Sequence, residues 1–153
     1  MSDDLNPRYS EKEEQLNILT HSFGLVMSFI AFPFLIFKSY DYDSFWKSSS
    51  LIIYGMSLIV LYAASTFYHA TKEPKRRRKL NILDHSAIYV LIAGTYTPFT
   101  LIILEGSLGW YIFSFTWTFA LIGIVLKLFY TGRFDKLSTI MYVFMGWQII
   151  FAI

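Results

Sequence analysis

The sequence predicts an all-α fold, a polytopic bundle of transmembrane helices. Apolar residues make up 55% of the 153-residue chain, aromatic residues 20% and charged residues only 16%, whereas soluble domains average about 25% charged residues. The mean hydropathy is +0.46, and a compact soluble domain of this length needs more polar surface than that value allows. Five apolar segments approach the roughly 20 residues that cross a bilayer core. Because the chain contains no cysteine, a disulfide framework and a thiolate metal site are excluded.

We expect five membrane-spanning helices, with nearly all of the charge in the stretches between them. Charged stripes at helical spacing, which mark a soluble helical protein, are absent from the apolar segments. The expected spans are residues 18–37, 51–68, 86–104, 108–126 and 137–153. Together they form one transmembrane domain, residues 18–153, which follows a polar cytosolic segment, residues 1–17.

The polar segment is expected to contain the start of a helix at the membrane interface. Ser10 and Glu13 have the spacing of a capping box, in which each side chain binds the backbone N–H of the other residue. The helix would begin at this point and run toward the first span.

The basic residues predict that the N-terminus lies in the cytosol. In that orientation every Lys and Arg except Lys38 and Lys47 falls on the cytosolic side, as the positive-inside rule requires. The opposite side carries aromatic residues of the kind found at membrane interfaces, namely Tyr40, Tyr42, Trp46, Trp110 and Tyr111. We therefore expect a multi-pass protein of the plasma (inner) membrane.

The basic run at residues 75–79 has two interpretations. Such runs occur in nucleic-acid-binding patches, and they also occur in cytosolic loops beside anionic lipid. Because this run lies between two spans, we favour the cytosolic loop. The expected partners are therefore membrane lipids, with a lipid-like substrate as a further candidate, and no nucleic acid.

The last span ends at Ile153 without a polar flank. Its 17 residues would form a helix of about 25 Å. We expect the chain to be a fragment or a truncated form of a longer protein.

The three histidines of the sequence are expected to lie at one depth. His21, His69 and His85 fall at the cytosolic ends of the first three spans, and Asp84 adjoins His85. An ionisable residue near the middle of a span costs about 2.5–3.5 kcal/mol, so such residues are functional candidates. Imidazole is a common zinc ligand, and a carboxylate can bind the metal or activate water.

Helical spacing adds further polar residues to this group. Glu14, Asn17 and His21 lie at positions i, i+3 and i+7, so they form one stripe if the helix is continuous. Ser65 and His69 lie four residues apart and share a face. From there Ser65 could hold the imidazole, or hold a water molecule against it.

Each of these residues also has a purely structural interpretation. A single histidine at the end of a span is more often an interfacial residue than a ligand. Asp84 is suited to be the N-cap of the third helix, because aspartate is favoured there and suits the positive helix end. Glu14 could simply be solvated. Spacing alone therefore leaves both the structural and the metal-binding interpretation open.

The third span contains a proline that is expected to kink it. Pro98 lacks an N–H group and its ring clashes with the carbonyl of Gly94. The kink would either shape a cavity that faces the polar residues or serve helix packing alone. Pro33 is expected to kink the first span in the same way.

These motifs resemble the bacterial haemolysin III family, which is grouped with the progestin and adipoQ receptors and more remotely with the alkaline ceramidases. The residues that carry the resemblance are Glu14, Asn17 and His21 in the first span, Ser65 and His69 in the second, and Asp84, His85 and segment 88–99 in the third. The resemblance extends from about Glu14 to the end of the chain.

The resemblance implies a seven-helix membrane protein with a zinc ion near the cytosolic side. It implies that His69 is a zinc ligand, that two more histidine ligands come from an H-x-x-x-H motif on a seventh helix, and that Asp84 holds or activates a zinc-bound water. Ser65 would support this catalytic site. The other polar residues would brace it, namely Glu14, Asn17, His21 and His85. The sequence departs from the pattern because it ends before a seventh helix.

Two functions of different classes follow from the resemblance. The first is zinc-dependent hydrolysis of lipid amide or ester bonds, in the manner of a ceramidase. The second is a non-enzymatic role in the membrane, such as haemolytic (cytolytic), pore-like, receptor-like or homeostatic activity, and the truncated chain could also be inactive. No span carries the repeated polar stripe of a water-filled channel.

Overall fold

The computed structural model confirms the all-α fold and describes residues 10–130 and 135–152. No strand occurs among these residues. The α-helices are α1 (Glu11–Ser39), α2 (Phe45–Ala70), α3 (Pro74–Pro98), α4 (Gly106–Tyr130) and α5 (Asp135–Trp147). A π-helix, η1 (Phe99–Leu104), continues α3, and a 3-10 helix, η2 (Gln148–Ala152), continues α5. Residues 1–9 of the predicted cytosolic segment lie outside the described residues.

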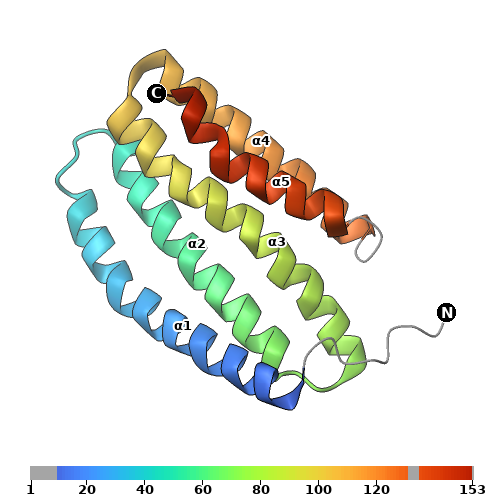
Figure 1. Cartoon of the computed structure of the whole chain (residues 1–153). Coiled ribbons are helices and arrows are strands. Elements are labelled where there is room, and N and C mark those ends of the chain that lie inside the picture. Colours follow the sequence, from blue (N-terminus) through green and yellow to red (C-terminus); the bar gives the residue numbers. More distant parts are fainter. Residues whose placement is uncertain (1–9, 131–134, 153) are drawn as a thin grey trace.

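The helices form a bundle in which α3 is central (Figure 1). On one side of α3, the helices α2 and α1 follow in a row, and on the other side α4 and α5 pack against it. Successive helices run in opposite directions along the bundle, so α1 begins at the end of the bundle where α2 ends and α3 begins (Figure 1).

Four helices of the described chain are long and apolar enough to cross a membrane, namely α1, α2, α3 with η1, and α4. Each of the first four predicted spans lies within one of these helices. The fifth predicted span corresponds to α5, which has 13 residues, and η2, which has 5. At about 1.5 Å and 2.0 Å per residue these two helices together reach about 30 Å, the thickness of a bilayer core.

The helix α1 begins at the predicted capping box. The Ser10 hydroxyl accepts a hydrogen bond from the backbone N–H of Glu13, and the Glu13 carboxylate accepts one from the backbone N–H of Ser10. From this cap the helix continues unbroken through Pro33.

The helix α3 begins earlier than predicted, at Pro74. The basic run 75–79 therefore forms the first turns of a helix rather than an irregular connection, and its predicted cytosolic location stays a prediction. Proline is favoured at the first helical position, and lysine and arginine are good helix formers, which explains the early start. The alternative in which Asp84 caps this helix is also wrong, because Asp84 lies well inside it.

At Pro98, where a kink was predicted, the helix type changes. The α-helix ends at Pro98 and η1 follows directly. Because Pro98 cannot donate to the carbonyl of Gly94, the regular pattern of hydrogen bonds is interrupted here. The Thr100 hydroxyl lies 2.9 Å from the carbonyl oxygen of Tyr96 and 3.1 Å from that of Thr97.

Glycines allow the helices to approach closely at several points. A Cβ atom at Gly24 of α1 would lie 2.4 Å from the Tyr62 ring of α2, and one at Gly94 of α3 would lie 2.3 Å from the Ser57 hydroxyl. These close approaches hold α1 and α3 against the two sides of α2. The polar end of the bundle is therefore assembled from all three helices.

Candidate functional site

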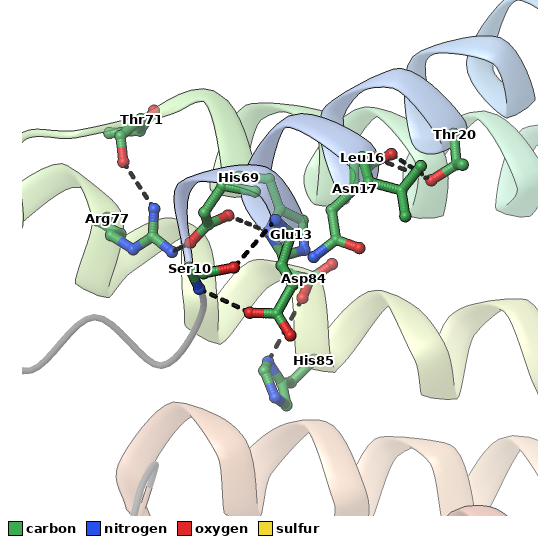
Figure 2. A network of polar contacts seen from close by, with 11 residues as sticks. Ser10, Glu13, Leu16, Asn17, Thr20, His69, Thr71, Arg77, Asp84 and His85 are labelled. Carbon is green, nitrogen blue, oxygen red and sulfur yellow. Dashed lines mark hydrogen bonds and ion pairs between the residues drawn. The ribbon is translucent and has the colours of Figure 1, made fainter.

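A cluster of ionisable side chains lies where α1 begins, α2 ends and α3 begins (Figure 2). We call it the polar cluster. Its members are Glu14 and His21 of α1, His69 of α2, and Arg77 and Asp84 of α3. Each helix contributes residues from its polar end. This arrangement agrees with the prediction that His21 and His69 lie at one depth.

The centre of the polar cluster is a contact between α1 and α2. Nδ1 of His69 lies 2.6 Å from Oε2 of Glu14, and both side chains are largely buried, at 7% and 17% exposure. Because a carboxylate can only accept, the imidazole donates from Nδ1. In the neutral form of the imidazole, this bond selects the tautomer in which the lone pair of the ring lies on Nε2.

The other oxygen of Glu14 binds α3. Nη2 of Arg77 donates to Oε1 of Glu14, and Nη1 donates to the carbonyl oxygen of Thr71 at 3.1 Å. The guanidinium also lies over the Tyr68 ring, with 4.7 Å from Cζ to the ring centroid. One arginine side chain therefore contacts both α1 and the end of α2.

His21 lies next to His69. The centroids of the two imidazole rings are 5.7 Å apart, and the Tyr62 ring lies 6.1 Å from His21 on another side. Among the described residues, Nδ1 of His21 is buried and has no hydrogen-bond partner, which is unusual for a polar atom in a protein interior.

Asp84 and His85 are adjacent on α3, but their side chains point in different directions. The Asp84 side chain is largely buried, at 13% exposure, and lies in the same group of polar side chains as His69 (Figure 2). His85 points away from His69 (Figure 2). Its Nδ1 donates to the carbonyl oxygen of Asn81 at 2.8 Å and lies 3.6 Å from the Asp84 carboxylate, which is beyond hydrogen-bond distance. His85 therefore adjoins the polar cluster through Asp84 alone, and its predicted role as a brace stays a prediction.

Two further predicted residues lie beside the cluster. Ser65 is buried on α2, one turn before His69. Asn17 lies on α1, and Figure 2 shows its side chain beside His69. The predicted roles of Ser65, as support for catalysis, and of Asn17, as a brace, stay predictions.

Sequence reasoning missed Arg77, because it assigned the whole basic run to membrane topology. The signal was present in the spacing. Arg77, Asn81 and Asp84 lie at positions i, i+4 and i+7, so they share a face of one helix. These residues share a face only because α3 begins at Pro74, before the predicted span.

The donor types of the polar cluster fit part of a zinc site. They include two neighbouring imidazoles and a carboxylate, and one imidazole nitrogen is buried without a partner. No three His, Asp or Glu residues of the described chain are grouped closely enough to hold a metal ion. A catalytic zinc usually has three protein ligands, so the cluster would need at least one ligand from outside the described residues.

The fold and this cluster define a multi-pass helical membrane protein with buried ionisable residues at one end of its spans. The model of the haemolysin-III related family matches residues 9–153. The chain therefore belongs to the haemolysin III family, which confirms the resemblance inferred from the sequence motifs.

Relatives from bacteria and mammals support this assignment. The chain is 46% identical over 145 residues to the hemolysin-3 homolog of Bacillus subtilis (strain 168), a match that covers 95% of this chain and 68% of the relative. It is 46% identical over 142 residues to hemolysin-3 of Bacillus cereus, covering 93% and 65%.

A mammalian relative, the human monocyte to macrophage differentiation factor, is 27% identical over 150 residues, covering 94% of this chain and 62% of the relative. The chain thus spans about two thirds of the length of these relatives. No solved structure matches the chain.

Proposed function

We propose that this protein is a zinc-dependent hydrolase of lipid amide or ester bonds, with its site on the cytosolic side of the plasma membrane. The observation that carries the proposal is the contact between His69 and Glu14, which is buried beside a second imidazole and near Asp84. A buried, carboxylate-bound histidine is the usual arrangement of a metal-ligating imidazole.

His69 would hold the zinc ion through Nε2. The further ligands would be the histidines of the seventh helix that the family resemblance implies. A bound zinc ion supplies a Lewis acid and an activated water. Glu14 keeps the His69 ring in the tautomer and orientation that such a ligand needs.

Asp84 would act as the general acid and base. A carboxylate beside the reacting water accepts its proton and then returns the proton to the leaving amine or alcohol. The buried hydroxyl of Ser65 would support the site from α2.

The proposed substrate is a lipid because the site lies at the end of membrane-spanning helices. The protein is surrounded by lipid, and large apolar side chains of α1, such as Phe23 and Phe34, are about two-thirds exposed, at 67% and 68%. An acyl chain could therefore reach the cluster from the bilayer. The basic first turns of α3 support the cytosolic assignment under the positive-inside rule.

The test is hydrolysis of labelled lipids by the protein purified as its own cell makes it and reconstituted into vesicles. We expect release of fatty acid from a long-chain amide or ester lipid, loss of release with a zinc chelator, and recovery when zinc is restored. Asp84→Asn should lower the rate by about 10²–10⁴-fold, the usual contribution of a general base.

The matched control is Asp41→Asn, which removes an exposed carboxylate at the opposite end of the bundle, where it pairs with Lys38. This variant should keep the parent rate. Release that is insensitive to chelator, or equal in Asp84→Asn and the parent, would refute the proposal.

The printed name of the Bacillus cereus relative, hemolysin-3, favours a second candidate, a non-enzymatic lytic activity on membranes. This candidate predicts leakage of dye from lipid vesicles that is unchanged in Asp84→Asn. Hydrolysis of neither amide nor ester lipids, together with such leakage, would replace the first proposal by the second.

A further inference from the structure

We propose that Arg77 is a positioning residue of the site, which holds Glu14 in place so that Glu14 can fix the imidazole of His69. This inference rests on the proposed function in one respect, namely that His69 is the residue whose orientation matters for metal binding. The contacts that carry it do not involve a metal.

The guanidinium of Arg77 joins three helices at one end of the bundle. Nη2 donates to Glu14 of α1, and Nη1 donates to the carbonyl oxygen of Thr71, the residue that follows the last turn of α2, at 3.1 Å. The plane of the guanidinium fits two acceptors at once, which a lysine cannot reproduce. The Thr71 carbonyl lies at the negative end of α2, where a cation is favoured.

Both oxygens of Glu14 are thereby committed. Oε1 accepts from Arg77 and Oε2 accepts from His69. If the arginine were absent, the carboxylate would keep only one of these two partners and would gain rotational freedom. The direction of its bond to His69 would then no longer be fixed.

The neighbours of Arg77 in the basic run lack this role. The side chain of Arg76 is 81% exposed and pairs with Glu73 at the surface, an ion pair that contributes little to stability. Arg78 is also exposed. The side chain of Arg77, at 25% exposure, is turned inward onto Glu14 and the Tyr68 ring. The run therefore contains one arginine that is turned toward the polar cluster, whereas its other basic residues are exposed.

The test is side-chain NMR of the histidines in the protein labelled with nitrogen-15. The 153 residues contain three histidines, and a single His→Gln variant at each of them assigns its ring signals. In the parent, His69 should show one tautomer with the proton on Nδ1. In Arg77→Met, we expect His69 to populate both tautomers, and zinc affinity, measured by competition with a chelator, to fall by about 10–100-fold.

Two further variants separate positioning from general effects. Arg78→Met removes the same charge from the adjacent residue and should leave both the His69 signals and zinc affinity unchanged. Arg77→Lys keeps the charge without the planar fork and should give values between those of the parent and Arg77→Met. It also serves as the test if Arg77→Met fails to fold.

The inference is overturned if His69 keeps its single tautomer in Arg77→Met, or if Arg78→Met changes it equally. Its failure is distinct from failure of the proposed function. If the parent binds no zinc but Arg77→Met still releases the His69 tautomer, the positioning role stands and the hydrolase proposal falls.

Discussion

Adjacent residues at the start of α1 have different tasks. Glu13 is exposed and closes the capping box with Ser10, whereas Glu14 points into the bundle and contacts His69 and Arg77. The two side chains differ because consecutive residues of a helix are rotated by about 100° around its axis. The cap therefore fixes where the helix begins, and that starting point fixes which glutamate reaches the polar cluster.

This difference predicts unequal effects of the same substitution at the two positions. Glu14→Gln replaces the carboxylate that accepts from both a guanidinium and an imidazole, and it should lower zinc affinity by about 10–100-fold. Glu13→Gln is the matched control, because glutamine also closes a capping box. Zinc affinity can be measured by chelator competition, and equal affinities in the two variants would contradict the assigned role of Glu14.

Only part of the site could be predicted from the sequence. The sequence placed His21 and His69 at one depth, because each lies at the predicted cytosolic end of an apolar segment. It also placed His85 there, but the side chain of His85 points away from His69. A depth assigned from hydropathy does not say which side of a helix a residue occupies. The role of Arg77 was not predicted, because the positive-inside rule already explained a basic residue at this position.

At the scale of the elements, the apolar segments predicted the helices better than they predicted helix ends. Hydropathy located the spans because a bilayer admits only backbone that satisfies its own hydrogen bonds. It could not locate the start of α3, because charged residues look the same in a loop and in a helix outside the bilayer. The π-helix η1 was not predicted either, because a proline indicates that the regular helix is interrupted but not which helix type follows it.

The packing of α4 against η1 gives a prediction for stability. A Cβ atom at Gly109 would lie 2.1 Å from the backbone carbonyl oxygen of Thr100, and a backbone atom cannot move aside as the tip of a side chain can. Gly109→Ala should therefore lower the free energy of unfolding by about 1–3 kcal/mol, as overpacked sites do. The measurement is denaturation in detergent, followed by circular dichroism.

Gly146→Ala in α5 is the control for this substitution. Among the residues that the structure describes, none comes within 4 Å of a Cβ atom placed at Gly146, and alanine is the better helix former by about 1 kcal/mol. This variant should be as stable as the parent or more so. A stable Gly109→Ala variant would show that α4 and η1 are farther apart than described.

At the scale of the whole molecule, the asymmetric charge of the chain predicts its orientation in the membrane. Arg78 at the start of α3 should face the cytosol, and Ser107 at the start of α4 should face the opposite side. Because these 153 residues contain no cysteine, Arg78→Cys and Ser107→Cys each add one reactive thiol to them, and labelling is compared with that of the parent. Both residues are exposed.

Labelling of intact cells with a maleimide that cannot cross membranes distinguishes the two sides. We expect Ser107→Cys to be labelled in intact cells and Arg78→Cys only after the cells are made permeable. The reverse pattern would place the polar cluster on the outer side and would contradict the cytosolic assignment.

The measurement that tests the central claim most directly is the metal content of the protein purified as its own cell makes it. We predict about one zinc ion per chain in the parent, as a mononuclear catalytic site requires, and none in His69→Ala. Asp84→Asn should retain the metal because it loses only the proposed acid and base, and His85→Ala should retain it because His85 points away from His69. Absence of zinc from the parent, or its retention in His69→Ala, would contradict the account.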